Sequence, residues 1–150
     1  MTLQSPEQQR VSVCLQVLPT ASHDARRSIG AIEQLSRSPD LCFVAQLLAA
    51  ELVGNVVRHS GLSSGRSFRL EAEWDRRAVR VEVVDGGDGY DPLAVLADHR
   101  TAERGHRGVA LVDALADRWG YRRRGGECRV WFELVLIPGR RPWQGREPVH

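Results

Sequence analysis

The sequence predicts an α/β protein of the α+β two-layer type: a mixed, largely antiparallel sheet with three main helices on one face. Hydrophobic alternation and helical periodicity follow one another as strand, helix, helix, strand, strand, helix, strand, strand. Two consecutive helices followed by a hairpin exclude a regular doubly wound series of strands and helices. The helices are therefore expected to cover one face of the sheet, and the partly exposed opposite face could support a homodimer.

The first part of the chain predicts one strand and two helices. Hydrophobic residues alternate with polar ones over 11–17, as in a half-buried strand, and Pro19 ends the run. A helix capped by Ser22 is expected to extend to about Arg37. A longer helix is expected over 40–59, with one stripe formed by Leu41, Val44, Leu48, Leu52 and Val56.

The second part predicts a hairpin, a helix and two final strands. Alternating runs over 68–74 and 79–83 are joined by a short polar turn, which is typical of a hairpin. Residues 90–106 are expected to form a short helix after Pro92 and a polar loop. A helix over 107–117 and strands near 121–124 and 128–137 complete the domain.

Composition excludes several classes of protein. All 21 basic residues are arginine, so a Walker-type phosphate loop and Schiff-base lysine chemistry are excluded. The net charge of +2 is too small to indicate nucleic-acid binding. Three widely separated cysteines predict neither a disulfide framework nor a zinc site, and favour the reducing cytoplasm.

Length and patterning predict one cytoplasmic domain. The 150 residues suit a single compact core. Residues 1–10 are expected to be a loose N-terminal segment, 11–137 the domain, and 138–150 a flexible tail. No signal pattern and no apolar run approaching the ~20 residues of a membrane span are found, so no membrane contact is expected.

The first candidate site lies on the second predicted helix. Glu51, Asn55 and Arg58 share one face because they are four and three residues apart. The Asn55 amide oxygen suits one position in the octahedral shell of Mg²⁺, which keeps waters and phosphates as other ligands. Glu51 could accept a proton from a hydroxyl or water that attacks a phosphate. Solvated helix faces carry the same residue types, so this set alone does not establish a site.

The second candidate is a carboxylate at a strand end followed by glycines, Asp85-Gly86-Gly87-Asp88-Gly89. The Asp85 carboxylate can accept a hydrogen bond from the exocyclic amine of adenine, whereas guanine presents a carbonyl, which cannot donate, at that position. Gly87 and Gly89 are expected to permit positive φ and to leave room for a flat base. A glycine-rich turn capped by Asp85 would produce the same pattern.

The third candidate, Glu103-Arg104-Gly105-His106-Arg107-Gly108, precedes the last predicted helix. A glycine-containing turn that enters a helix offers unpaired N–H groups and a positive dipole end to an anion. Arg104 and Arg107 could add bidentate phosphate contacts. An ordinary solvated loop is the alternative explanation.

In this order the three segments resemble the motifs of the GHKL (Bergerat-fold) ATPase superfamily. The chain is most similar to the small stand-alone anti-sigma-factor serine/threonine kinases and their actinobacterial ATP-binding relatives, and the resemblance covers about residues 11–136. The family's N box resembles 51–59, its Asp-x-Gly-x-Gly box 85–89, its second glycine box 107–112 with 115–117, and its closing strand 130–134.

The resemblance implies ATP and Mg²⁺ as cofactors. Asn55 would hold the metal, Glu51 would be the general base, and Asp85 would read adenine. Gly87 and Gly89 would shape the base pocket, and the rest of the cofactor site would comprise Arg58, Arg104, His106, Arg107 and Gly108. The family's second glycine box begins with glycine where this chain has His106, and a side chain there either clashes with the triphosphate or donates to it.

The resemblance also implies a function and partners. The protein would phosphorylate a serine or threonine of an antagonist protein and would sequester a sigma factor. A non-catalytic partner-binding switch with weak or absent ATP turnover is the alternative, which His106 favours. A third hypothesis is nucleic-acid binding through Arg122–Arg124, otherwise read as a solvated turn, and Arg140-Arg141, although the small net charge disfavours it.

Overall fold

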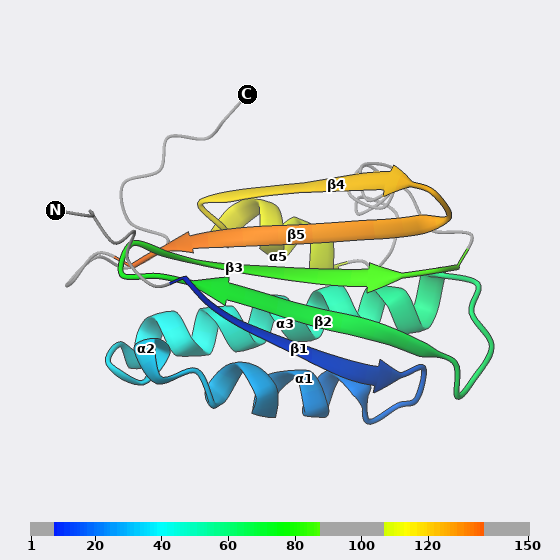
Figure 1. Cartoon of the computed structure of the whole chain (residues 1–150), viewed down its shortest axis with the longest axis horizontal. Helices are drawn as coiled ribbons and strands as arrows, with labels where there is room; N and C mark the ends of the chain where they lie inside the picture. The colour runs from blue at the N-terminus through cyan, green and yellow to red at the C-terminus, as the bar shows by residue number, and fades with distance from the viewer. Residues whose placement is uncertain (1–7, 88–106, 137–150) are drawn as a thin grey trace, which may run out of the picture.

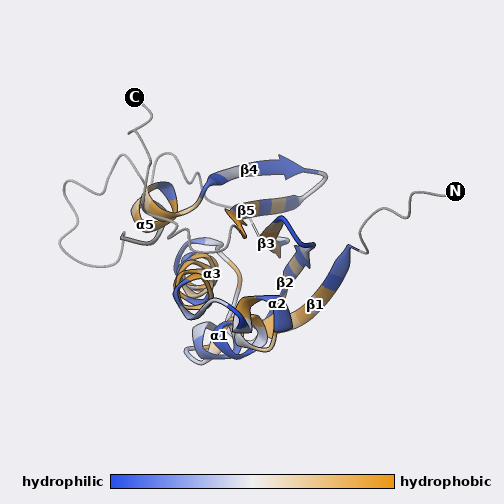
Figure 2. Cartoon of the chain, turned by 90° about the vertical axis from the view of Figure 1, so that its left-hand side faces the viewer, coloured by the Kyte–Doolittle hydropathy of each residue, from blue (hydrophilic) through white to orange (hydrophobic). Residues whose placement is uncertain are grey.

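A computed structural model describes residues 8–87 and 107–136 of the chain. Its elements are β1 (Gln9–Gln16), α1 (Ala21–Gly30), α2 (Glu33–Ser36), α3 (Pro39–His59), β2 (Ser67–Trp74), β3 (Ala78–Asp85), α5 (Arg107–Leu115), β4 (Arg118–Arg124) and β5 (Glu127–Val135). The strands form a five-stranded sheet in the order β1-β2-β3-β5-β4. Figures 1 and 2 show α1, α3 and α5 on one face of this sheet, which confirms the predicted two-layer architecture.

The sheet is more regular than expected. All four strand pairs within the described residues are antiparallel, so the predicted mixed sheet is purely antiparallel in this part of the chain. The expected hairpin joins β2 to β3, and Asp75 accepts hydrogen bonds from the Arg77 and Ala78 N–H groups inside the turn. A polar Asx turn of this kind fixes the register of both strands.

Helix α3 is the centre of the core. Its predicted stripe is buried, with Leu48 fully inaccessible to solvent. The helix packs between α1 and α5 and lies on strands β3 and β5 of the sheet. The sequence predicted no membrane span, yet α3 is long and apolar enough to cross a membrane by length and composition alone. Because 61% of its most apolar window is buried inside the protein, core packing accounts for this apolar character.

The predicted helix over 22–37 is wrong as a single element. Glycine is a poor helix former, and α1 ends at Gly30. Ile32 then adopts an extended conformation, and the short α2 follows. This bend buries both Ile32 and Leu35 against the core. Ser22 lies inside α1 instead of capping it, and its hydroxyl donates to the Ala50 carbonyl of α3 over 3.2 Å.

The predicted domain boundaries are only partly covered by the structure. β1 begins at Gln9, so the last two residues of the expected loose segment 1–10 belong to the sheet, where Gln9 pairs with Trp74. Residues 1–7, the predicted short helix and loop within 90–106, and the predicted tail 138–150 lie outside the described residues. Arg122–Arg124, read as a solvated turn, are the last three residues of strand β4.

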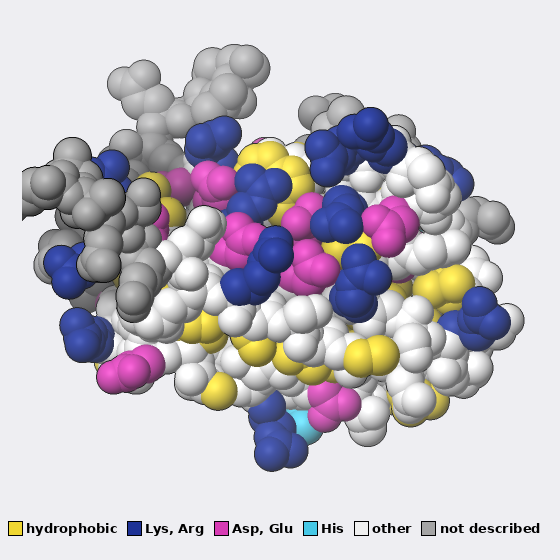
Figure 3. Space-filling view, viewed as in Figure 1, with side chains coloured by type: hydrophobic (Ala, Val, Ile, Leu, Met, Phe, Trp, Pro, Cys, Tyr) yellow, Lys and Arg dark blue, Asp and Glu magenta, His cyan; other side chains and the backbone are white. Residues whose placement is uncertain are grey.

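The face of the sheet away from the helices carries charges of both signs. Figure 3 shows arginine and acidic side chains side by side across its middle. Arg129 lies among Glu71, Glu82 and Glu127, with contacts of 3.1 to 3.7 Å. Arg80 bonds Glu133 and stacks on the Trp131 ring, with its guanidinium carbon 4.0 Å from the ring centroid. The exposed face predicted for a homodimer is therefore an ion-paired surface, and the homodimer itself stays a prediction.

Burial predicts a large difference between two apolar positions of α3. Leu48→Ala should lower the free energy of unfolding by about 2–5 kcal/mol, because it leaves a cavity between α3 and the sheet. Phe43→Ala should change it by less than about 0.5 kcal/mol, because Phe43 is 65% exposed. Urea denaturation of both variants measures this difference, and equal destabilisation would contradict the described packing of α3.

Candidate functional site

Buried polar side chains gather at one junction of the fold. Among the described residues, the buried polar or charged side chains are Asn55, Ser60 and Asp85, with exposed fractions of 0%, 1% and 2%. Asn55 and Ser60 mark the C-terminal end of α3, and Asp85 ends β3. Both ends lie on the same side of the molecule in Figure 1. Since polar groups are costly to bury, their concentration at one junction indicates a functional site.

The turn after β3 packs directly against the end of α3. A Cβ added to Gly87 would collide with the Ser60 carbonyl oxygen and would lie 3.1 Å from the Leu62 side chain. Gly87 does not have positive φ; the positive-φ glycines of the described chain are Gly61, Gly65, Gly125 and Gly126. The expectation of positive φ at Gly87 is therefore wrong, and Gly87 is needed because two backbone segments approach closely.

Asp85 keeps one carboxylate oxygen without a partner. Its Oδ1 accepts the Gly87 N–H over 3.0 Å, which closes the turn. Its Oδ2 is buried and has no hydrogen-bond partner in the described part of the chain. Burial raises the pKa of the Asp85 carboxyl, while the bond from Gly87 and the charge of Arg123 act in the opposite direction. The free oxygen is suited to accept a hydrogen bond from a ligand donor.

Arg123 is a residue that the sequence did not place at this site. It pairs with Cys128 across β4 and β5, and Cys128 pairs with Asp85 across β5 and β3. The three residues therefore form one row across three strands, on the face that the helices cover. The signal was present in the alternation of β5, whose buried Cys128 fixes which face of β4 Arg123 occupies.

The predicted helical trio is found at the end of α3, but two of its members contact each other. Arg58 Nη2 donates to Asn55 Oδ1 over 3.0 Å. The Arg58 guanidinium lies close above Gly54. A Cβ at position 54 would be only 3.0 Å from Arg58 Nη1, so a larger residue there would push the guanidinium away. Asn55 Nδ2 is buried without a partner in the described residues. The amide of Asn55 is thus held by a side chain that is itself exposed.

Glu51 lies one helical turn before Asn55 and is half-buried. No hydrogen bond or ion pair joins it to another residue of the described chain. The structure therefore places it on the same helix as Asn55 with its carboxylate uncommitted to a described partner, as a proton acceptor would require.

The remaining predicted site residues belong to the segment before α5. Arg107 and Gly108 form the start of α5, as predicted, and this helix packs against α3. Nothing is described of their side chains. Gly89, Arg104 and His106 lie outside the described residues, so their predicted roles stay predictions.

The donor set at the junction is compatible with a nucleotide but supplies few metal ligands. The described residues contain no cluster of three or more His, Cys, Asp or Glu side chains that could hold a metal ion. A Mg²⁺ ion here would draw most ligands from phosphates and water, with Asn55 Oδ1 as one protein ligand. Arg58 occupies that oxygen and would have to move away, which its exposure permits.

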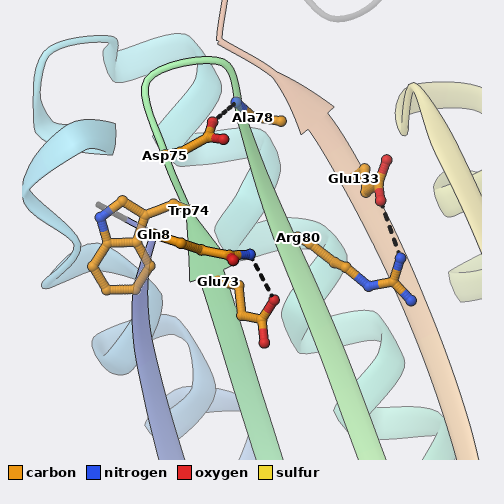
Figure 4. Close-up of a pocket in the computed structure, with 7 residues that line it drawn as sticks. All are labelled: Gln8, Glu73, Trp74, Asp75, Ala78, Arg80 and Glu133. Atoms are coloured by element: carbon orange, nitrogen blue, oxygen red, sulfur yellow. Dashed lines mark hydrogen bonds and ion pairs between the residues drawn. The ribbon is translucent and has the colours of Figure 1, made fainter. Parts of the chain in front are cut away.

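A hollow elsewhere on the protein is distinct from this junction. It has a volume of about 150 Å³ and lies at the β2–β3 hairpin on the ion-paired face, with the lining residues labelled in Figure 4. Most of its polar groups are hydrogen-bonded, as in Gln8 to Glu73 and Arg80 to Glu133, each over 3.0 Å, while Trp74 Nε1 is buried without a partner among the described residues. It is smaller than the roughly 300–1,000 Å³ of ligand pockets, and its charges are satisfied.

Comparison with known proteins identifies a family. Residues 15–134 match the family described as a histidine kinase-like ATPase domain. This range runs from within β1 to within β5 and includes the junction of α3 and β3. No curated protein matches the chain.

The close approach at Gly87 predicts a position-specific effect. Gly87→Ala should lower the free energy of unfolding by about 1–3 kcal/mol, because the added carbon forces the turn away from the Ser60 carbonyl. Gly86→Ala is the matched control: among the described residues, its Cβ would meet only the Gly126 carbonyl oxygen, at 4.0 Å. Thermal unfolding of both variants measures the effect, and equal stability of the two would contradict the described contact.

The environment of Asp85 predicts that this residue costs stability. Because burial raises its pKa above the value in the unfolded chain, the free energy of unfolding falls as pH rises through the folded-state pKa. Asp85→Asn should therefore raise the free energy of unfolding at pH 7 by roughly 1 kcal/mol, or about 2–4 °C in Tm. The gain should shrink toward zero below about pH 4, where the carboxyl is protonated in both states.

The exposed Asp24 provides the control for this measurement. Asp24→Asn should change the free energy of unfolding by less than about 0.5 kcal/mol at pH 7. A variant Asp85→Asn that is less stable than the parent protein at pH 7 would show that the ionised carboxylate stabilises the fold.

Proposed function

Because the chain belongs to the histidine kinase-like ATPase family of the GHKL superfamily, whose domains bind ATP, we propose that it is an ATP-dependent anti-sigma-factor-like regulator. It transfers the γ-phosphate of ATP to a serine or threonine of an antagonist protein, and it sequesters a sigma factor. The observation that carries the proposal is the junction of α3 and β3, where the buried polar side chains of the described chain gather.

Asp85 is the adenine-reading residue in this proposal. Its Oδ2 is a buried acceptor with no described partner, and the exocyclic amine of adenine is a donor. A carbonyl at the same position of the base, as in guanine or hypoxanthine, would face the carboxylate with another acceptor. The cost of burying Asp85 is then offset only when adenine is bound, which makes the residue a specificity determinant.

The end of α3 and the start of α5 surround the phosphates. Arg58 leaves Asn55 Oδ1 and turns to the phosphates, and Asn55 becomes free to ligate Mg²⁺. A Mg²⁺ ion bound with the nucleotide would neutralise phosphate charge. The first N–H groups of α5 at Arg107 and Gly108 face the same charge, since a helix N-terminus favours anions.

Glu51 serves as the general base. Its carboxylate accepts the proton of the serine or threonine hydroxyl as the hydroxyl oxygen attacks the γ-phosphorus, and ADP leaves. Its place one turn from Asn55 sets it beside the phosphate end of the nucleotide, and no described residue competes for it. Phosphoryl transfer needs mainly positioning and charge neutralisation, so few further groups are required.

The partners and the cellular location follow from the resemblance and from chemistry. The sigma factor and antagonist are those of the anti-sigma-factor kinases that the motifs resemble. A cytoplasmic location fits three cysteines that form no disulfide and the supply of ATP there.

One observation favours a second function, a partner-binding switch with weak or absent turnover. The hydrogen bond from Arg58 occupies Asn55 Oδ1, the proposed metal ligand. A partner or a nucleotide that draws Arg58 away would then change the conformation without catalysis. Calorimetry with ATP and Mg²⁺ followed by a transfer assay separates the two functions, because the switch binds ATP and transfers no phosphate.

The kinase proposal predicts that binding and transfer separate at Glu51. Glu51→Gln should bind ATP within about twofold of the parent protein but lose about 10²–10⁴-fold in transfer rate, because only proton removal is affected. Calorimetry measures the binding, and transfer from γ-labelled ATP to a candidate antagonist protein measures the rate. The control variant Glu33→Gln, at an exposed position of α2, should keep both properties.

The outcomes of this test are distinct. Undiminished transfer by Glu51→Gln would remove Glu51 as the base and leave the ATP site intact. Absence of ATP binding by the parent protein would overturn the kinase proposal itself.

A further inference from the structure

Arginines on the ion-paired face of the sheet are balanced by carboxylates except at one place. Arg10, Arg69, Arg80, Arg118 and Arg129 each contact a glutamate. Arg122 and Arg124, on the same face of β4, make no ion pair with any other described residue. The positive charge at the end of β4 is therefore uncompensated in this part of the protein, as the arginines at the tip of β4 in Figure 3 illustrate.

The sheet register explains why Arg122 and Arg124 have no ion-pair partner among the described residues. Arg124 lies opposite Glu127, but the Glu127 carboxylate contacts Arg69 at 3.6 Å and Arg129 at 3.1 Å instead. Arg122 lies directly opposite another arginine, Arg129. Like charges opposite each other destabilise a strand pair. An acidic group bound beside Arg122 and Arg124 would relieve this repulsion.

β4 is also an edge strand. Within the described residues it pairs only with β5, so its other side presents backbone N–H and C=O groups to whatever lies beyond the sheet. In Figure 1 it forms the upper border of the sheet. An extended peptide can add to such an edge by main-chain hydrogen bonds, while its side chains alternate between the two faces.

We propose that the β4 edge binds an extended acidic segment of a partner protein, with carboxylates two residues apart that pair with Arg122 and Arg124. The side chains of Arg122 and Arg124 lie on one face of β4, about 7 Å apart along the strand, which is the spacing of alternate residues in the added strand. The inference goes beyond the ATP site and does not rest on it.

The surroundings favour a peptide over a nucleic acid. Glu127 lies opposite Arg124, and Glu71, Glu82 and Glu127 surround Arg129 on the inner side of β4, so the uncompensated positive charge is limited to the edge of the sheet and does not continue as a track for a phosphate backbone. The net charge of the chain is only +2. A peptide can satisfy the backbone of β4 as well as its arginines, whereas a nucleic acid can satisfy only the arginines.

The test uses a labelled ten-residue peptide of alternating threonine and glutamate and the full chain without nucleotide. Fluorescence anisotropy should show saturable binding that Arg122→Ala/Arg124→Ala weakens by about tenfold or more. The matched control Arg76→Ala/Arg77→Ala, at the exposed β2–β3 turn, should bind within about twofold of the parent protein. Circular dichroism melts verify that both double variants fold.

Three further probes separate spacing, backbone pairing and simple charge. A peptide of the same composition with its glutamates contiguous should bind more weakly, and so should the alternating peptide with N-methyl groups on alternate amides. Equal binding of either one, or no binding of the alternating peptide, would overturn the proposal. An oligothymidylate of equal charge that binds as tightly as the peptide would also overturn it and would assign the patch to nucleic acid.

Discussion

The candidate site depends on the burial of one carboxylate where a strand meets the end of a helix. Asp85 is 2% exposed, accepts one backbone hydrogen bond and leaves its second oxygen without a described partner. An arrangement of this kind costs free energy in the isolated protein, because a desolvated carboxylate is poorly compensated by a single hydrogen bond. The fold tolerates it through a large apolar core under the same sheet, in which α3 supplies most of the buried helical surface. Sites that bind ligands commonly keep such unsatisfied groups, since the ligand supplies the missing partner.

The two faces of the sheet carry different kinds of residue. The covered face carries the core and, at one end, the row of Asp85, Cys128 and Arg123. The opposite face carries ion pairs that are each worth little but together keep arginines and glutamates matched. Gly87 brings the end of β3 against the end of α3, because only a residue without a side chain lets the turn after β3 touch the Ser60 carbonyl. Membership of the histidine kinase-like ATPase family supports our proposal that this junction receives ATP.

Hydrophobic periodicity was enough to predict the layers, α3 and the hairpin, because these depend on burial patterns that are local in sequence. It failed at Gly30–Ile32, where the need to bury Ile32 and Leu35 broke a helix that periodicity alone would continue. The strand end at Asp85 and the amide at Asn55 were predictable as candidates from residue type. Two arrangements were not predictable: the hydrogen bond from Arg58 to Asn55 Oδ1 depends on a rotamer, and the place of Arg123 in the same row as Asp85 depends on the register of three strands. The positive φ expected at Gly87 was wrong, and its close approach to Ser60 was not predictable because Ser60 is distant in sequence; its role in a base pocket stays a prediction.

The most direct measurement of the central claim compares ATP with inosine triphosphate, which replaces the exocyclic amine by a carbonyl and leaves the rest of the nucleotide intact. If the Asp85 carboxylate accepts a hydrogen bond from that amine, calorimetry of the parent protein should show inosine triphosphate binding at least about tenfold more weakly than ATP. The preference should disappear in Asp85→Asn, whose side chain offers both a donor and an acceptor. Equal affinity of the parent protein for the two nucleotides, or a preference that survives in Asp85→Asn, would contradict the account.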